Sequence, residues 1–347
     1  MTDPLTILDR IESDLSDQWD ELHLTKLGYT KIAKPVAVSS PWGQAEKWHS
    51  SAQIGLGELR AALTPPPPPP AAFDPHTNWQ RPPWNLDATV QPIDPNSADL
   101  ISKWVARGNI RYPNVCTNSY SQAWCEGKAG DPLYDINVVT YGKKVITGVP
   151  IPLGTKPSPD SDAHLVIFDL VGKREIDLWQ VVPSKWTAGS GDVYPLGSDP
   201  APATGSNAAG FPSLALSIWP EEIQAGRIDH ALAFSVLKAA PSHRYPATKH
   251  DGQGLADDLP EGVWMALPPS GAFFNSGWPT WVKPIYRALQ DHGMFLMDQG
   301  GSLGIAGVCP INGGVKWSDV GMGTGGSMGF PSDFPWSSMR VLAPPTP

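Results

Sequence analysis

Two kinds of hydrophobic spacing divide this chain. Between Leu5 and Leu22, apolar residues recur at steps of three or four, and acidic residues occupy the other positions. This pattern predicts an amphipathic helix within residues 1–34. A single helix of this length is not stable alone, so its apolar stripe must bury against other protein. A partner protein, identical copies of the chain and the chain's own body are the three alternatives, and we favour assembly.

Residues 35–94 show no regular period. Six consecutive prolines, Pro65 to Pro70, favour a polyproline II segment, which spans roughly 19 Å at about 3.1 Å per residue. We interpret residues 35–94 as an extended proline-rich linker or arm that lies on a surface. Recognition by an SH3-like module is the alternative for the proline run.

From Pro95 onward, alternating patterns and turn residues dominate, which predicts a mostly β domain over residues 95–347. We expect a jelly-roll-like β-sandwich with a few short helices. The expected helices start near Ser97, Pro220 and Pro284, and each is followed by a glycine. The expected strands are 135–140, 144–149, 164–170, 175–182, 228–236, 294–297 and 303–306. Residues 313–329 are predicted to be loop because they are rich in glycine.

Composition limits the function classes. The net charge of −9 among 347 residues argues against nucleic-acid binding, which needs clustered Lys and Arg. No apolar run is long enough to span a membrane, and the acidic N-terminus does not resemble a secretory signal. Three cysteines are too few for a disulfide framework. Cys116 and Cys125 could pair or remain free thiols.

The hairpin formed by 164–170 and 175–182 carries candidate chemistry. With a turn of two or four residues, Glu175, Asp177 and Trp179 share a face with His164 and Phe168. Carboxylates beside an indole suit a sugar, because acids accept hydroxyl hydrogen bonds while the ring covers the apolar sugar face. A solvated outer face with an incidental tryptophan is the alternative.

Paired carboxylates also raise the possibility of glycan cleavage, with Glu175 and Asp177 as catalytic candidates. A glycosidase needs two acids about 5–5.5 Å or 6.5–9.5 Å apart. Other acids that could take part are Asp162, Asp169, Asp229 and Asp251. His230 shares its strand face with large apolar residues, which is typical of a hydrogen-bonded core histidine. Asp162-x-His164 offers only two metal ligands, so no metal site and no cofactor are expected.

The chain contains 15 tryptophans, an unusual number. Many must fill the core, but several stand beside loop-forming residues, where a rigid aromatic face could stack on a sugar ring. Core packing and ligand stacking are therefore both open for each of them. The tryptophans in question are Trp79, Trp84, Trp124, Trp278, Trp281, Trp317 and Trp336.

A spaced set of residues resembles a little-characterised β-sandwich family found in actinobacterial secreted proteins and in tail proteins of phages that infect actinobacteria. The set comprises Asp162-x-His164, Asp169, Glu175-x-Asp177-x-Trp179, the runs 186–191, 209–212 and 222–232, the segment from Ala288 to Asp298, and Phe334-Pro335-Trp336. The likeness covers roughly residues 95 to 345. Trp219 and the pair Leu303-Gly304 depart from the family's pattern, so its ligand is not carried over.

Together with the N-terminal part, the resemblance implies a minor tail protein of a mycobacteriophage-like siphophage. Residues 1–94 would attach to other phage tail proteins, in a homotrimer, and residues 95–347 would contact a host cell-surface glycan. The expected location is the virion tail. The ligand-binding residues implied are His164, Asp169, Glu175, Asp177, Trp179 and Trp186. A tail-borne glycoside hydrolase or polysaccharide lyase and a purely structural tail collar are the alternatives.

Overall fold

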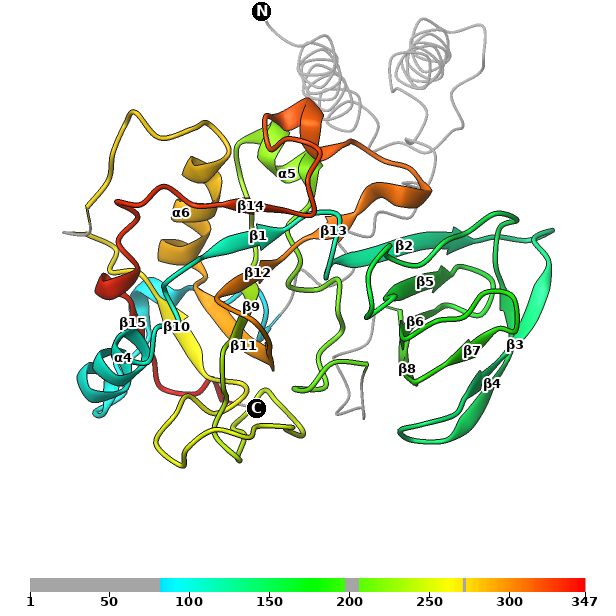
Figure 1. The fold of residues 1–347 in the computed structure, drawn as a ribbon, viewed down its shortest axis with the longest axis horizontal. Helices are drawn as coiled ribbons and strands as arrows, with labels where there is room; N and C mark the ends of the chain where they lie inside the picture. Colours follow the sequence, from blue (N-terminus) through cyan, green and yellow to red (C-terminus); the bar gives the residue numbers. More distant parts are fainter. Residues whose placement is uncertain (1–81, 197–205, 271–272, 347) are drawn as a thin grey trace, which may run out of the picture. The chain divides into compact units, whose positions relative to one another are not determined.

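The structure is a computed structural model that describes residues 82–196, 206–270 and 273–346 (Figure 1). The chain divides into two units, and all described residues belong to the second, Phe73–Pro347. The predicted helix in 1–34 and most of the predicted arm lie outside the described residues. Within the described part, the expectation of a mostly β protein with few short helices is confirmed.

The largest sheet has seven strands in the order β14-β1-β12-β9-β11-β10-β15. It is mixed, because β1 runs parallel to β12 and β9 runs parallel to β11, whereas β9 and β12 are antiparallel. Its strands are β1 (Asn114–Cys116), β9 (Leu232–Val236), β10 (Trp264–Ala266), β11 (Met294–Gln299), β12 (Gly304–Ala306), β14 (Ser327–Gly329) and β15 (Arg340–Val341).

Two smaller sheets lie to the right in Figure 1. One has the order β13-β2-β5-β6-β8 and the other the order β4-β3-β7. The strands of the five-stranded sheet are β2 (Gln122–Gly127), β5 (Leu165–Asp169), β6 (Arg174–Trp179), β8 (Ser190–Pro195) and β13 (Val308–Cys309). Those of the three-stranded sheet are β3 (Leu133–Val138), β4 (Lys144–Pro150) and β7 (Thr187–Ala188).

The chain passes twice from the seven-stranded to the five-stranded sheet. β1 leads into β2, and β12 leads into β13. β1 and β12 are parallel neighbours in the seven-stranded sheet, and β2 and β13 are parallel neighbours in the five-stranded sheet. Gly307 lies in the second crossing, where an added Cβ would come within 2.5 Å of the Cys116 carbonyl oxygen. This double crossing forces parallel pairing. The sheets therefore differ from the all-antiparallel jelly roll expected from the sequence.

The predicted hairpin forms with the expected parity. Asp169 pairs with Arg174, which leaves a four-residue turn, and Phe168 pairs with Glu175. One face of the hairpin is apolar and packs against the three-stranded sheet, in a two-layer arrangement. The residues that meet between these two sheets include Leu165, Ile167, Ile176 and Leu178 from the hairpin and Ile136, Val138, Ile146 and Val149 from β3 and β4.

Strand β9 is central to the seven-stranded sheet and buried on both faces. Leu232, Phe234 and Val236 belong to one apolar cluster, while Ala231 and Ala233 belong to another. The sequence predicted this division of side chains. The predicted strand was longer at its start, however, because residues 228–231 lie outside the ladder.

Three short helices pack on the first of these clusters. They are α4 (Ser97–Ala106), α5 (Pro220–Ala225) and α6 (Val282–Asp291), all close to their predicted positions. Helix α5 ends at Gly226, whose φ of 74° is a conformation that favours glycine. Helix α4 lies beside β15, where the Val341 N–H donates to the Ser97 hydroxyl at 2.9 Å. The 3-10 turns are η1 (Ala88–Val90), η2 (Pro310–Asn312), η3 (Trp317–Val320) and η4 (Trp336–Ser338).

Two further expectations need correction. The end of the predicted linker is not an exposed arm, because Trp84 is 2% exposed and Ile93 forms a bridge with Leu342. Trp84 supplies apolar surface that the domain buries, whereas Ile93 stays half exposed. The predicted loop 313–329 contains η3 and β14, since Trp317 is buried and anchors the segment with hydrogen bonds to the Thr117 and Val308 carbonyls.

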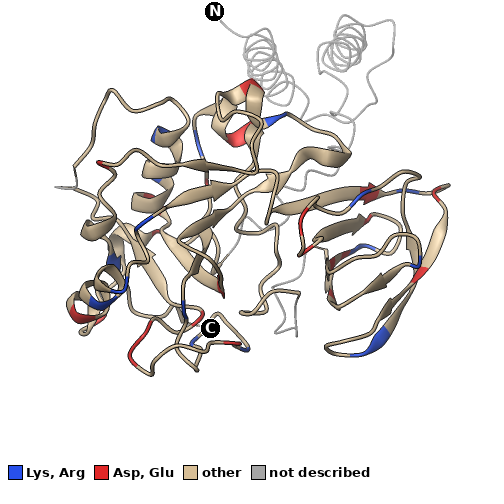
Figure 2. Ribbon diagram, viewed as in Figure 1, with Lys and Arg blue, Asp and Glu red and all other residues tan. Residues whose placement is uncertain are grey.

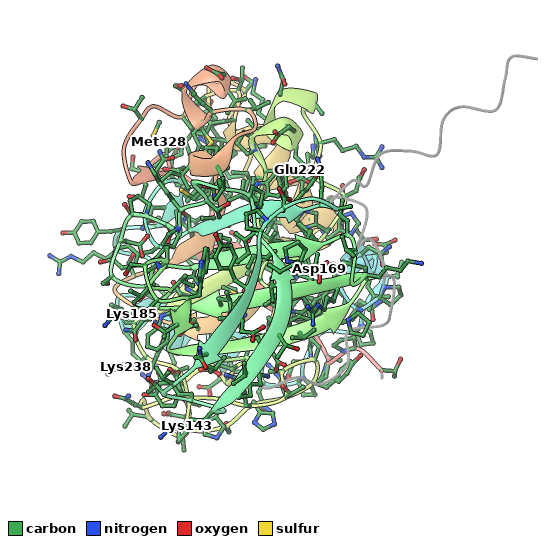
Figure 3. All side chains as sticks on the ribbon, turned by 90° about the vertical axis from the view of Figure 1, so that its right-hand side faces the viewer. Lys143, Asp169, Lys185, Glu222, Lys238 and Met328 are labelled. Atoms are coloured by element: carbon green, nitrogen blue, oxygen red, sulfur yellow. The ribbon has the colours of Figure 1, made fainter. Side chains whose placement is uncertain are left out.

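No helix among the described residues is long and apolar enough to cross a membrane. Lys and Arg are distributed over separate elements of the described part (Figure 2). Figure 3 shows Lys143, Lys185 and Lys238 at the periphery, and all three are exposed.

Candidate functional site

A cavity of about 1270 Å³ opens between the seven-stranded and five-stranded sheets. The carboxyl ends of the parallel strands β9 and β11 reach it through Ser235 and Asp298. The five-stranded sheet contributes side chains from the strand ends nearest to the crossings. Ligands commonly bind where strand ends of two sheets diverge, because the loops there leave space between rigid walls.

One wall is a row of side chains across four neighbouring strands. Trp179 pairs with Ser190 in the register of β6 and β8. In the parallel strands β2 and β5, Ala123 pairs with Leu165. Gln122 comes directly before Ala123, and His164 comes directly before Leu165. All four residues line the cavity. The strand register therefore brings together an amide, an imidazole, an indole and a hydroxyl.

Two buried acceptors in this row have no hydrogen-bond partner. The Gln122 side chain is 3% exposed and its Oε1 is unpartnered, and the His164 side chain is 7% exposed and its Nδ1 is unpartnered. Burial lowers the pKa of His164, so the ring is neutral at neutral pH. A neutral imidazole without a proton on Nδ1 accepts there. Since leaving such atoms unpaired is costly, both atoms point to a ligand that donates hydrogen bonds.

Aromatic side chains surround this row. Trp179 is half-buried and its ring lies 6.1 Å from that of Tyr141, at an interplanar angle of 39°. Tyr141 and Tyr120 are 64% and 59% exposed and also line the cavity. Exposed ring faces beside buried acceptors are a combination that suits a sugar, which has an apolar ring face and hydroxyl donors.

Asp298 lines the cavity from the end of β11. A register shift between Leu296 and Asp298 marks a β-bulge, a feature that re-aims side chains. The Gln299 N–H donates to Asp298 Oδ1 at 2.8 Å. Burial and the neighbouring charge of Asp251 raise the pKa of Asp298 to about 7. A carboxyl with such a pKa exchanges protons near neutral pH, as acid catalysts do.

Asp251 also lines the cavity and is held by two contacts. Gln299 Nε2 donates to the Asp251 carbonyl at 3.0 Å, and the Asp251 N–H donates to Glu261 Oε1 at 3.4 Å. The Glu261 side chain is fully buried. Burial and the neighbouring Asp251 carboxylate raise the pKa of Glu261 to about 9, so Glu261 retains its proton at neutral pH.

Lys249 supplies the positive charge on this side of the cavity. Burial lowers the pKa of Lys249, while Asp298, Glu261 and Asp251 act in the opposite direction. Asp162 lines the cavity near His164, and its charge partly offsets the lowering of the His164 pKa by burial. Among the described residues, no group of three or more His, Cys, Asp or Glu side chains is placed to hold a metal ion.

The two catalytic candidates from the sequence, Glu175 and Asp177, are each 0% exposed and do not line the cavity. They share the Trp179 face of the hairpin, as predicted, but that face is covered by other protein. The Ser213 N–H donates to Asp177 Oδ2 at 2.6 Å. Burial raises the pKa of Asp177 to about 6, although hydrogen bonds with Ser213 and Glu175 act to lower it.

The other predicted ligand residues separate into two groups. His164 and Trp179 line the cavity, whereas Asp169 and Trp186 do not. Asp169, labelled in Figure 3, accepts from the Val171 and Gly172 N–H groups and from Arg174 Nε at 2.7 Å, so it holds the hairpin turn. Trp186 packs on Tyr134 with ring centroids 4.8 Å apart.

The tryptophans beside loop residues belong to the core. Trp124 is half-buried against Trp219 and Phe168. Trp79 lies outside the described residues. The others are at most 4% exposed: Trp84, Trp278, Trp281, Trp317 and Trp336. His230 is also a core residue, as expected, because its Nε2 lies 3.0 Å from Glu222 Oε1. All three cysteines are free, so Cys116 and Cys125 do not pair.

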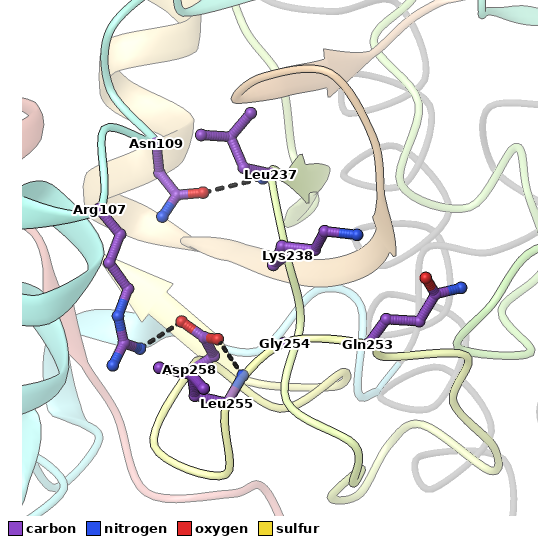
Figure 4. A pocket seen from close by; sticks show the side chains of 8 residues that line it. All are labelled: Arg107, Asn109, Leu237, Lys238, Gln253, Gly254, Leu255 and Asp258. Carbon is purple, nitrogen blue, oxygen red and sulfur yellow. Dashed lines mark hydrogen bonds and ion pairs between the residues drawn. The ribbon is translucent and has the colours of Figure 1, made fainter.

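A second pocket, of about 450 Å³, lies beside helix α4 (Figure 4). Its polar groups serve the fold. Arg107 is paired with Asp258, and the Leu237 N–H donates to Asn109 Oδ1 at 2.9 Å. Asn109 Nδ2 donates in turn to the Trp104 carbonyl at 3.0 Å. These groups are satisfied by protein, unlike Gln122 Oε1 and His164 Nδ1 of the larger cavity.

Several cavity residues could not be singled out from sequence. Gln122 gave no signal, and Asp298 entered only as the end of a family-like segment. Asp251 was one of several acids that could take part in cleavage, and the sequence did not pair it with a second carboxylate. Compared with protein-family profiles, curated proteins and solved structures, the chain gives no match.

Proposed function

We propose that this protein is a phage tail component that contacts a glycan of the host cell envelope, and that the cavity between the two sheets binds that glycan. The observation that carries the binding proposal is the row formed by Gln122, His164, Trp179 and Ser190. Its buried acceptors require donors, and its indole offers a flat apolar surface.

A carbohydrate satisfies both demands at once. Its hydroxyl groups donate to Gln122 Oε1 and His164 Nδ1, while a ring face packs on Trp179. The cavity volume of about 1270 Å³ exceeds the roughly 300–1,000 Å³ of ordinary small-molecule pockets. This supports an oligosaccharide segment over a single sugar.

Calorimetric titration of the full-length chain with fragments of mycobacterial arabinogalactan and with a panel of other envelope glycans tests this proposal. Trp179→Ala should weaken binding about tenfold or more, since a central aromatic anchor contributes more than about 1.4 kcal/mol. Trp186→Ala is the matched control, because it removes an indole that lies outside the cavity. If no glycan binds the wild-type chain, or if both variants bind equally well, the cavity is not a glycan site.

Attachment to the tail is a separate part of the proposal. It rests on the order of segments in the sequence and on the family resemblance, with residues 1–94 contacting other tail proteins in a homotrimer. Deleting residues 1–72 in the phage genome should prevent incorporation of the chain into virions, measured by mass spectrometry of purified particles. Normal incorporation would refute this attachment. A purely structural tail collar predicts loss of incorporation but no glycan binding.

Cleavage of the bound glycan is the second candidate function, and one observation favours it. Asp251 and Asp298 face the cavity, in contrast to the sealed pair Glu175 and Asp177. An enzymatic role therefore depends on acids that come from β11 and from the loop before β10.

A further inference from the structure

Asp298 and Asp251 lie on two segments that the side chain of Gln299 joins. Gln299 follows Asp298 in β11, and its Nε2 donates to the Asp251 carbonyl at 3.0 Å. Gln299 Oε1 accepts from the Gln253 N–H at 3.3 Å and from the Ala239 N–H at 3.4 Å. These three contacts fasten the loop that carries Asp251 to the end of β11, so both carboxyl groups belong to the same part of the cavity wall.

We propose that Asp298 and Asp251 hydrolyse a glycosidic bond of the glycan that occupies this cavity, with Asp298 as the acid and Asp251 as the base. This inference rests on the proposed function, since it requires that a glycan binds there. It adds a reaction and two catalytic residues to a site otherwise described only by binding.

The reaction balances with water as the only co-reactant. Asp298 transfers its proton to the glycosidic oxygen while the bond from that oxygen to the anomeric carbon breaks. The oxygen of a water molecule forms the new bond to the anomeric carbon, and Asp251 takes a proton from this water. Asp251 then releases that proton to solvent and Asp298 regains one, so each cycle produces two free hydroxyl-bearing fragments.

The surroundings of Asp298 suit the role of an acid. Burial is the main cause that raises its pKa to about 7, and the charges of Asp251 and Asp162 add to it. Lys249, the cation on this side of the cavity, faces the same group of carboxylates. A fraction of the Asp298 carboxyl groups therefore carries a proton at neutral pH, and this protonated fraction falls as the pH rises above about 7.

Glu261 acts as a positioning residue. It is fully buried, and its pKa of about 9 means that it holds a proton at neutral pH. Glu261 Oε1 accepts from the Asp251 N–H at 3.4 Å, so Glu261 holds the backbone that carries the Asp251 side chain. Glu261 does not line the cavity, so it does not touch the substrate.

The two acids are not the only indication of a ligand. Gln122 and His164 line the same cavity, and each presents a buried acceptor without a partner. A glycan whose hydroxyls reach those acceptors while its ring covers Trp179 would be fixed in place. Fixing a substrate is what makes catalysis by two carboxyl groups efficient.

The test uses the full-length chain with the glycan fragments described above, in water enriched in heavy oxygen. Hydrolysis should place one heavy oxygen atom at each new reducing end, detected by mass spectrometry. Asp298→Asn should reduce the rate by about 10²- to 10⁴-fold, the range typical of a lost general acid, and Asp251→Asn should also reduce it strongly. Both variants should still bind the glycan. Asp99→Asn, on the exposed face of helix α4, is the matched control.

The outcomes separate the two proposals. If the wild-type chain binds no glycan, the proposed function fails and the hydrolysis fails with it. If the wild-type chain binds a glycan but releases no labelled product, binding stands and the hydrolysis is refuted. Cleavage at an unchanged rate by Asp298→Asn would also refute it. Because glycan binding by each variant reports folding, loss of activity in an unfolded variant cannot be mistaken for support.

Discussion

The five-stranded sheet and the end of β11 each carry acidic side chains, but their surroundings differ. Glu175 and Asp177 lie on a regular hairpin and are 0% exposed, and Asp177 accepts from the backbone of Ser213. Asp298 and Asp251 lie at a bulged strand end and in a loop, and both face the cavity. Side chains on regular strands that are covered on both faces are closed to a ligand, whereas side chains at strand ends are open to one.

This difference shows that residue type and spacing do not identify a catalytic pair. Both sets contain carboxyl groups with raised pKa values, about 6 for Asp177 and about 7 for Asp298, and burial is the main cause in both. Only access to the cavity distinguishes them. The predictions below test whether the hairpin acids serve stability and the cavity acids serve chemistry.

The largest expected effect concerns Glu261, the buried partner of Asp251. Its pKa is about 9 in the folded chain, against a usual 4.5. At pH values between these two pKa values, the folded state keeps a proton that the unfolded state has released. The free energy of unfolding therefore falls as the pH rises from the lower pKa to the higher one. The slope for one proton is about 1.4 kcal/mol per pH unit. Glu261→Gln should remove this contribution, measured by urea unfolding from pH 5 to pH 8.

Glutamine is a suitable replacement because it is uncharged like the protonated acid, and its amide oxygen can still accept from the Asp251 N–H. At pH 5 the two chains should have similar free energies of unfolding. As the pH rises, the free energy of unfolding of the variant should increase relative to that of the wild type. Parallel pH profiles for the two chains would mean that Glu261 is ionised in the folded state.

The fold was predictable where it depends on local periodicity. The parity of the hairpin, the two faces of β9 and the end of α5 at Gly226 follow from neighbouring residues. The pairing of β9 with both β11 and β12 could not be predicted. Those strands lie some sixty to seventy residues further along the chain, and no local pattern specifies which distant strands become neighbours.

The site was predictable only where it belongs to the hairpin. His164 and Trp179 were found because they share a face that the turn length determines. Gln122, Asp251 and Asp298 reach the cavity from three separate segments, and each has unremarkable neighbours in sequence. The loop tryptophans left core packing and ligand stacking open for a related reason, since glycine and proline beside an indole do not reveal whether the ring is buried.

For the hairpin acids, Asp177→Ala should lower the free energy of unfolding by about 1–3 kcal/mol, because the buried Ser213 N–H would lose its acceptor. Asp177→Asn keeps an acceptor oxygen and should cost less. Chemical denaturation of the two variants measures the difference. Glycan affinity of the folded variants should equal that of the wild type, and weakened binding would place Asp177 in the functional site after all.

Asp169 provides a milder test of the same comparison. Asp169→Asn removes the charge that pairs with Arg174, which lies 2.7 Å away and is 25% exposed. An oxygen remains to accept from the turn N–H groups, so the loss of stability should be about 1 kcal/mol. Thermal unfolding measures it. Unchanged glycan binding is expected, since Asp169 holds a turn; a large loss of affinity would contradict this.

The smallest expected effect is a shift of the Asp298 pKa on replacing its neighbour. Asp251→Asn removes a negative charge that favours the protonated form of Asp298, so the pKa of Asp298 should fall below about 7. The fall should be partial, because burial is the larger cause and the substitution leaves burial unchanged. Titration of the Asp298 carboxyl by carbon NMR in both chains measures it. An unchanged pKa would show that the two carboxyl groups do not interact, and it would remove the electrostatic link between the proposed acid and base.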